Sequence, residues 1–183
     1  MPQVITLLRA EGVSGVQIAD LSLVHAAVDM AGFLVGDCDG QAASNLRSGA
    51  VEIRCGGPCT GPVVTDVEIG HVGGFAVAMD GAVAGASLSR LLVHDVGAGG
   101  LRIGSSNSSM RSEDMPSGLS LLDSTVRDGG HVYRMGPGLL LAQCHGCEVS
   151  HNDISGFFCK KTLGGSRDAA FRPFILPQFA RCG

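Results

Sequence analysis

An internal repeat constrains the fold of this chain more than any other feature. One spacing recurs: an aliphatic residue, four mostly polar or small positions, a second aliphatic residue, one further residue, and then His, Asp or Gly. It occurs in "IADLSLVH" (18–25), "VTDVEIGH" (64–71), "LSRLLVHD" (88–95), "LLDSTVRD" (121–128) and "VSHNDISG" (149–156). The starting positions indicate a period of about 24 residues, with one offset near double and two insertions.

A second short apolar run follows most copies, as in "AVEI" (50–53), "FAVAM" (75–79), "LRI" (101–103) and "GLLLA" (138–142). Short β-branched runs between turn glycines are typical of strands. A unit of about 24 residues with two strands is too short for a propeller blade, which needs about 40 residues. The repeat also lacks the Leu–Asn consensus of leucine-rich repeats. The repeat therefore predicts an all-β fold, a right-handed parallel β-helix (solenoid) of about five or six rungs with aliphatic side chains stacked between rungs.

Two insertions interrupt the repeat, at 26–48 and 104–118, and we expect them to leave the solenoid at turns. The second carries a glycosylation sequon at 107–109, a pattern that is common by chance. The segment 159–183 lacks the repeat and has two prolines in its apolar part, which disfavour a central strand. We therefore expect a partial β-helix domain over 1–158 and an irregular or disordered tail over 159–183.

Composition narrows the classes of partner. A net charge of −4 offers no basic face for nucleic acid. No apolar run reaches the roughly 18 residues of a membrane span. The first residues, "MPQVITLLRAEG", lack the basic start and long apolar stretch of a signal peptide. We expect neither a nucleic-acid partner nor a membrane span, and these residues do not indicate a localisation.

The turn "HDVGAGGLRIG" (94–104) is a candidate phosphate-binding loop, because glycine-rich turns that follow a strand bind nucleotides. Arg102 occupies the last position of G-x-G-x-x-G, where Gly or Ala is needed, and no amphipathic helix follows. The glycines are therefore expected to turn one rung into its next strand.

The repeat places His25, His71, Asp95 and Asp128 at one equivalent position. Asp95 and Asp128 fall in neighbouring rungs, with Cα atoms expected about 4.8 Å apart. Two carboxyl groups that close do not both ionise freely, which suits a general acid beside a nucleophile or base, as in glycosidases. The alternative is that turn positions favour Asp for backbone reasons alone. We predict Asp95 and Asp128 as catalytic residues and keep this alternative open.

Further polar residues beside that column are candidates for substrate binding: His71, His94, Arg102, Arg127, His131, Tyr133 and Arg134. An aromatic ring next to cations, as in "HVYR" (131–134), suits sugar stacking and hydroxyl contacts, and a polar loop without a ligand is the alternative. Asn152, in the last repeat, is predicted to belong to an inward amide stack and not to a catalytic site.

Seven cysteines raise the question of a metal site. The pairs in "CGGPC" (55–59) and "CHGC" (144–147) look like a split zinc site, but three rungs, or about 14 Å, separate them, whereas Zn–S bonds measure about 2.3 Å. The sequence also shows no cluster of three acids at one end of a column that would support calcium. We predict no metal and no cofactor. Local disulfides and buried free thiols both remain open for these cysteines.

Three segments, "HVGGFAVAM" (71–79), "LSRLLVHDVGAGGLRIG" (88–104) and "GPGLLLAQCHGCEVSHNDISGFF" (136–158), resemble right-handed parallel β-helix proteins of the pectin-lyase-like superfamily. The similarity spans about 13–158 and points to a glycoside-hydrolase-like branch that acts on cell-wall polysaccharides. It implies an extracellular protein that hydrolyses glycosidic bonds, with a polysaccharide or oligosaccharide as its partner. The alternatives are a non-catalytic glycan-binding or scaffold β-helix, or an inactive fragment, because the family's flanking sequence is missing at both ends.

Overall fold

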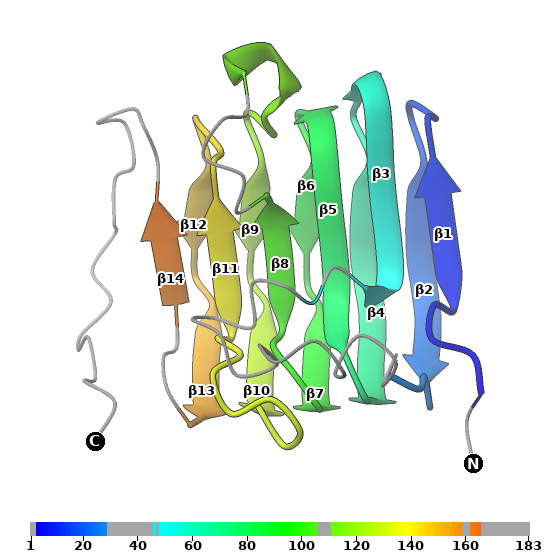
Figure 1. Ribbon diagram of the computed structural model, residues 1–183, viewed down its shortest axis with the longest axis vertical. Helices are drawn as coiled ribbons and strands as arrows, with labels where there is room; N and C mark the ends of the chain where they lie inside the picture. Colours follow the sequence, from blue (N-terminus) through cyan, green and yellow to red (C-terminus); the bar gives the residue numbers. More distant parts are fainter. Residues whose placement is uncertain (1–2, 29–45, 47, 106–110, 159–161, 166–183) are drawn as a thin grey trace.

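The computed structural model describes residues 3–28, 46, 48–105, 111–158 and 162–165, which form two parallel β-sheets (Figure 1). The first sheet contains, in spatial order, β1 (Leu8–Glu11), β3 (Gly49–Thr60), β5 (Phe75–Ala84), β8 (Leu101–Gly104), β11 (Leu139–Ala142) and β14 (Thr162–Gly165). The second contains β2 (Gln17–Val24), β4 (Val63–Val72), β6 (Ser87–Ser89), β7 (Leu92–Val96), β9 (Ser120–Leu122), β10 (Thr125–Gly129), β12 (Glu148–Ser150) and β13 (Asp153–Phe157). A 3-10 helix, η3 (Ser112–Asp114), lies between β8 and β9.

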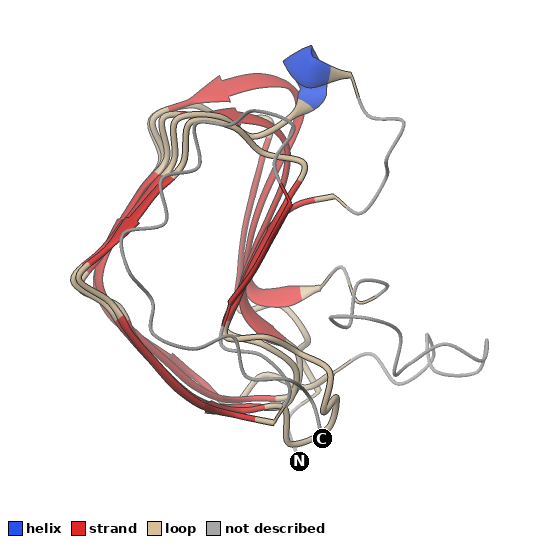
Figure 2. Cartoon of the chain, turned by 90° about the vertical axis from the view of Figure 1, so that its left-hand side faces the viewer, coloured by secondary structure: helices blue, strands red, loops and turns tan. Residues whose placement is uncertain are grey.

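The chain alternates between the two sheets. Strand β4 pairs on one side with β2 and on the other with both β6 and β7, so that each later crossing of the second sheet consists of two short strands. The same division occurs in β9 with β10 and in β12 with β13. Figure 2, which looks along the stack of strands, shows the second sheet bent between these halves and the first sheet facing it.

Strand register confirms the repeat. Ile18, Val64, Leu88, Leu121 and Val149 pair in series across the second sheet. The apolar runs of the first sheet are likewise in register, through Val51, Val77, Leu101 and Leu139. The prediction of an all-β chain built from stacked parallel strands is therefore confirmed, and the arrangement is compatible with a β-helix.

The core lies between the sheets. Every second residue of each strand points inward, so Val93 and Val126 of the second sheet and Leu101 and Ile103 of the first are completely buried. A fully buried aliphatic side chain of this size contributes about 1.5–3 kcal/mol relative to its exposed state. The stacked aliphatic rows hold the strand ends, and with them the turns, at fixed heights along the molecule.

The structure extends the first sheet past the expected boundary at 158, because β14 pairs in parallel with β11. The rest of the expected tail, 159–161 and 166–183, lies outside the described residues, as do most of the insertion 26–48 and the sequon at 107–109. The described part of the chain contains no helix with the length and apolarity that a bilayer crossing requires.

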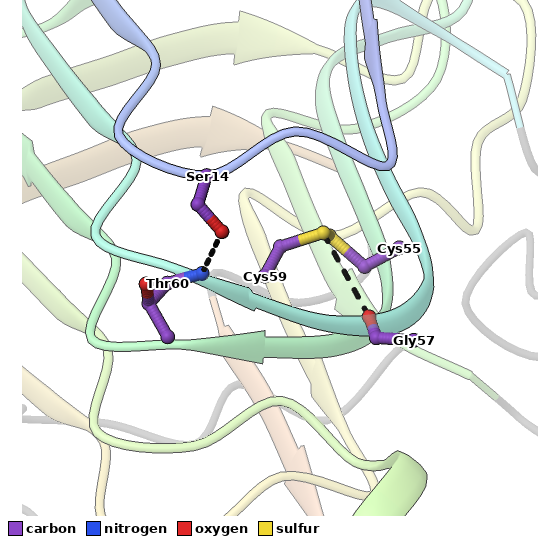
Figure 3. The surroundings of a disulfide bond; sticks show 5 residues. All are labelled: Ser14, Cys55, Gly57, Cys59 and Thr60. Atoms are coloured by element: carbon purple, nitrogen blue, oxygen red, sulfur yellow. Dashed lines mark hydrogen bonds between the residues drawn. A yellow bond between two sulfur atoms is a disulfide. The ribbon is translucent and has the colours of Figure 1, made fainter.

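One cysteine pair is bonded. Cys55 and Cys59 form a disulfide within β3, with Cα atoms 5.9 Å apart (Figure 3). The turn after it is tied to the preceding repeat, because the Thr60 amide donates a hydrogen bond of 3.1 Å to Ser14 Oγ. Cys144 and Cys147 are free thiols. The structure therefore contains both a local disulfide and free thiols, the two alternatives that the sequence left open. Cys38, Cys159 and Cys182 lie outside the described residues.

Candidate functional site

The predicted column lies where the strands of the second sheet end, at the bottom of Figure 1. We define the corner column as His25, His71, Asp95, Asp128 and Gly156, which the flanking strand pairs place in register. All five residues have left-handed backbone, with φ between 48° and 70°. Asp and His are among the few residues besides Gly and Asn that adopt this conformation readily. Backbone geometry therefore contributes to the choice of residue at this corner.

His131 brings an imidazole to the two neighbouring carboxyl groups. Its Nε2 lies 3.2 Å from Asp128 Oδ1 and 3.5 Å from Asp95 Oδ1. One ligand atom from each of these three residues lies within 4.8 Å of the others. The three side chains are between 40% and 63% exposed, so the group opens to solvent. The predicted proximity of the two carboxyl groups is present in the structure.

The loop that carries His131 is held on the sheet by backbone hydrogen bonds. The amides of Val132 and Tyr133 both donate to the Gly97 carbonyl at 2.8 Å. The turn after Asp95 and the loop after Asp128 are thus joined directly, which fixes the position of the His131 backbone.

His71 orients Asp95 from the other side. Its Nδ1 lies 2.5 Å from Asp95 Oδ2, so the two oxygens of Asp95 face two different imidazoles. The His71 ring stacks on the ring of His25, with centroids 5.1 Å apart and an interplanar angle of 14°. The His94 ring meets His71 edge-on at 5.4 Å. Four of the six histidines of the chain therefore gather around two aspartates.

His94 is fixed by Glu68 and by a glycine. Glu68 Oε1 lies 3.1 Å from His94 Nε2, and Ser22 Oγ donates to Glu68 Oε2 at 2.8 Å. These two bonds, the one to His94 above all, lower the pKa of Glu68 below its ordinary value. A Cβ atom at Gly70 would lie only 2.5 Å from His94 Cε1, so the absence of a side chain there makes room for the ring.

Glu68, Gly70 and Ser22 were not predicted from the sequence. Strand alternation places Glu68 and Gly70 on the same outward face of β4, and the offset of 24 residues sets His94 beside Gly70. A signal was therefore present in the repeat itself. Arg127 extends this face, since β10 pairs with β7 in the register that brings Arg127 next to His94. Its side chain is exposed.

The prediction that Arg102 binds substrate at this column is corrected by the structure. Its side chain is only 1% exposed and its Nη1 lies 3.3 Å from Asp80 Oδ2. Arg102 belongs to β8, in the opposite sheet, and its outward row contains the equally buried Glu52 and Ala78. Strand alternation correctly places Arg102 on the outer face of the sheet, but that face is covered.

Tyr133 is the second correction. It is 4% exposed and packs with Phe75 and Ala98, so its ring does not form a sugar-stacking surface. Arg134 is exposed but points to Phe158, with its guanidinium 5.3 Å from the ring centroid. Of the seven predicted binding residues, the structure thus gathers four beside the carboxyl pair: His71, His94, Arg127 and His131.

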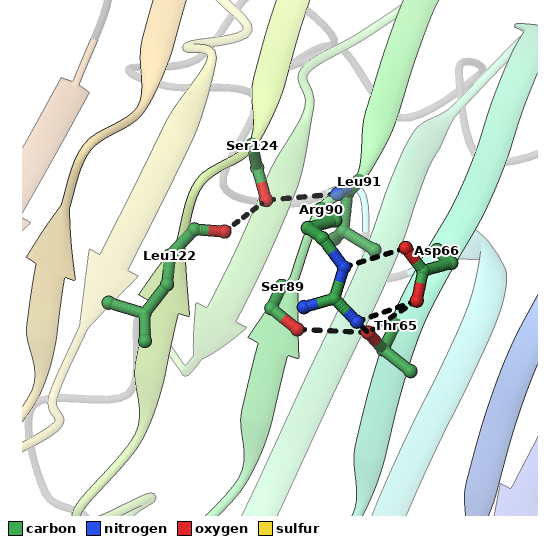
Figure 4. A network of polar contacts seen from close by, with 7 residues as sticks. All are labelled: Thr65, Asp66, Ser89, Arg90, Leu91, Leu122 and Ser124. Atoms are coloured by element: carbon green, nitrogen blue, oxygen red, sulfur yellow. Dashed lines mark hydrogen bonds and ion pairs between the residues drawn. The ribbon is translucent and has the colours of Figure 1, made fainter.

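A second column of left-handed residues runs along the bend of the second sheet. We define the bend column as Asp20, Asp66, Arg90, Asp123 and His151, with φ between 50° and 55°. Figure 4 shows the Arg90 guanidinium beside the Asp66 carboxylate, with Nε to Oδ1 at 2.7 Å and Nη2 to Oδ2 at 2.6 Å. This pair raises the pKa of Arg90 and lowers that of Asp66.

Beneath the bend, Asn152 bonds to backbone groups of the preceding repeat. Its Oδ1 accepts from the Ser124 amide and its Nδ2 donates to the Leu121 carbonyl, both at 2.8 Å. The side chain therefore holds one repeat on the next, which agrees with a structural role, although its partners are main-chain atoms and not a stack of amides.

The free thiols form a further reactive pair, at the turn between β11 and β12. A hydrogen bond between Cys144 and Cys147, together with burial, raises the pKa of Cys144. The same bond lowers the pKa of Cys147 to about 7. Cys147 is partly exposed whereas Cys144 is buried, so Cys147 is the more nucleophilic of the two.

No family model, curated protein or solved structure matches this chain. The corner column must therefore be interpreted from its own geometry.

Proposed function

We propose that this chain is a right-handed parallel β-helix of about five or six rungs, of the pectin-lyase-like kind, that hydrolyses glycosidic bonds in a cell-wall polysaccharide through Asp95 and Asp128. The observation that carries the proposal is the exposed pair of carboxyl groups, with oxygens within 4.8 Å of each other. This separation is near the roughly 5–5.5 Å of retaining glycosidases and below the roughly 6.5–9.5 Å of inverting ones.

The contacts suggest a division of roles. Asp95 has one oxygen toward His71 and the other toward His131, which holds the carboxylate in the fixed orientation that a nucleophile needs. Asp128 is the more exposed of the two, at 63%, and can exchange a proton with solvent as a general acid must. Arg127, His94 and Glu68 on the adjacent sheet face are available for sugar hydroxyls.

Location outside the cell is part of this proposal. The Cys55–Cys59 disulfide supports it, because disulfides persist in oxidising compartments.

A second candidate function is a glycan-binding or scaffold β-helix without catalysis. It is favoured by the bend column, which also carries Asp and His in left-handed backbone. It is also favoured by the burial of Arg102 and Tyr133, which leaves fewer groups to hold a sugar chain.

The test is release of reducing ends from a panel of neutral and acidic cell-wall polysaccharides. Asp95→Asn and Asp128→Asn should each lower the rate by about 100- to 10,000-fold. Asp123→Asn is the matched control, since it changes an exposed aspartate with the same backbone conformation in the bend column. Saturable binding without any hydrolysis would favour the second candidate, and a rate equally insensitive to all three variants would contradict the catalytic roles.

A further inference from the structure

The corner column carries a group of donors that glycoside hydrolysis does not need. Two carboxylates are sufficient for that reaction, yet His131 is directed at both of them from a separate loop. We propose that Asp95, Asp128 and His131 bind a divalent transition-metal ion, with Zn²⁺ as the probe of choice. The inference rests on the contacts of the three residues and does not depend on the proposed function.

The distances fit a tetrahedral ion. Ligand atoms bound to zinc at about 2.0–2.2 Å around a tetrahedron lie about 3.3–3.6 Å apart. The two measured edges, from His131 Nε2 to Asp128 Oδ1 and to Asp95 Oδ1, are 3.2 Å and 3.5 Å. The third edge, between the carboxylate oxygens, is at most 4.8 Å, and it joins two side chains that are both exposed to solvent.

Donor chemistry selects the class of ion. Calcium and magnesium take oxygen ligands, whereas one imidazole with two carboxylates suits zinc and its neighbours in the first transition row. Three protein ligands with solvent access leave a fourth position for water or a ligand. Two carboxylates and one neutral imidazole, the forms in which these side chains ligate metals, would bring two negative charges to the ion, which a divalent cation compensates.

His71 supplies the outer contact that such a site requires. Metal ligands are usually oriented by a hydrogen bond from a residue that does not touch the ion. His71 makes this contact to Asp95 Oδ2, and its own ring is fixed by stacking on His25. Asp95 Oδ1 is thereby left toward His131 and the proposed ion.

The experiment measures zinc binding to the full chain, freed of metal with a chelator, by isothermal titration calorimetry. One ion should bind per chain. Asp95→Asn, Asp128→Asn and His131→Ala should each weaken binding by more than about 10-fold, and His71→Phe by about 10-fold through lost orientation. Asp123→Asn and His151→Ala in the bend column are matched controls and should bind zinc as the unchanged protein does.

Cobalt provides a readout that needs no variant. The unchanged protein with Co²⁺ should show the visible absorption of a tetrahedral site without the near-ultraviolet charge-transfer band of thiolate ligation. A thiolate band, or loss of binding in the variant that combines Cys144→Ser with Cys147→Ser, would assign the ion to the cysteines and overturn the proposal. Absence of saturable zinc binding, or a preference for Ca²⁺, would overturn it as well.

A negative result in the zinc-binding experiment does not contradict the proposed hydrolysis, and a negative result in the hydrolysis experiment does not contradict zinc binding. Calorimetry reports binding whether or not any polysaccharide is cleaved. If both proposals hold, zinc occupies the two catalytic carboxylates and should inhibit hydrolysis reversibly, with activity restored by the chelator. Hydrolysis without zinc binding refutes only this inference, and zinc binding without hydrolysis refutes only the proposed function.

Discussion

The bend column and the corner column are built on the same backbone but pair their charges differently. Both place Asp and His, two of the residue types that tolerate left-handed φ, at successive heights along the second sheet. In the bend column, Asp66 is paired with Arg90, and Asp123 lies 3.5 Å from His151. In the corner column, Asp95 contacts His71 of the same column, and Asp95 and Asp128 both also contact His131, which comes from a separate loop.

The difference shows how to separate backbone requirements from chemistry. An aspartate in a left-handed turn is explained by the turn alone, and Asp66 and Asp123 make their side-chain contacts within their own column. The corner column departs from that pattern because a residue from outside the column, His131, lies within 3.5 Å of two neighbouring aspartates. That departure, and not the presence of aspartate, is the reason to assign chemistry to the corner.

The largest effect on stability is expected beneath the bend, at Ser124. This side chain is 2% exposed, and its hydroxyl accepts from the Leu91 amide at 3.0 Å and donates to the Leu122 carbonyl at 2.8 Å (Figure 4). Ser124→Ala leaves a buried amide without its partner and should cost about 1–3 kcal/mol in the free energy of unfolding. Urea denaturation monitored by circular dichroism measures this loss.

Ser150→Ala is the control for that measurement, since its hydroxyl donates to Glu148 at the surface. If Ser124→Ala lowers the free energy of unfolding no more than the control does, then the hydrogen bonds of Ser124 do not stabilise the bend.

The sequence predicts those features of the structure that follow from the spacing of the repeats, and it does not predict those that depend on contacts with distant segments. The offsets between repeats already place Asp95 beside Asp128, because parallel strands in register carry equivalent residues to the same height. The environment of Arg102 was not predictable in this way. Strand alternation tells which face of a sheet a residue occupies, but segments distant in sequence decide whether that face is covered.

The loop after β10 gives the same lesson. The sequence "HVYR" suggests three exposed binding residues, yet only His131 reaches the carboxyl pair, whereas Tyr133 is buried against Phe75. The difference is fixed by backbone hydrogen bonds from this loop to Gly97, which no local pattern specifies.

A shared backbone conformation predicts equal sensitivity of the two columns to β-branched residues. Asp95 and Asp123 have φ of 48° and 50°. Asp95→Val and Asp123→Val should each lose about 1–2 kcal/mol of stability, because a Cβ branch is strained in this region. Asp95→Gly and Asp123→Gly should lose less. Thermal unfolding compares the four proteins, and a valine tolerated in only one column would show that the two backbones are not equivalent.

Gly70→Ala tests how the corner face is assembled. The added methyl group would meet the His94 ring and displace it from Glu68. The pKa of Glu68 should therefore rise toward its ordinary value of 4.5. Ser22→Ala should raise it less, because the His94 bond contributes more. Carboxyl titration by NMR measures both shifts.

The sign of the accompanying pH effect follows from the direction of the Glu68 shift. A lowered pKa means that the Glu68 contacts stabilise the fold above the ordinary value and lose this contribution as pH falls through the lowered one. Gly70→Ala should remove the share of this acid dependence that comes from His94. An unchanged Glu68 titration would show that the ring does not depend on the glycine.

The smallest effect is expected for Arg90→Gln in the bend column. Removal of the guanidinium should raise the pKa of Asp66, which the Arg90 hydrogen bonds hold below 3.8. Stability at pH 7 should barely change, because an ion pair between exposed side chains competes with water and salt. NMR titration of Asp66 and a thermal melt at pH 7 measure the two quantities, with Arg127→Gln as the control that leaves Asp66 unaffected. A large drop in melting temperature would mean that alternating charge is required to hold the bend, and the two columns would then differ in stability as well as in chemistry.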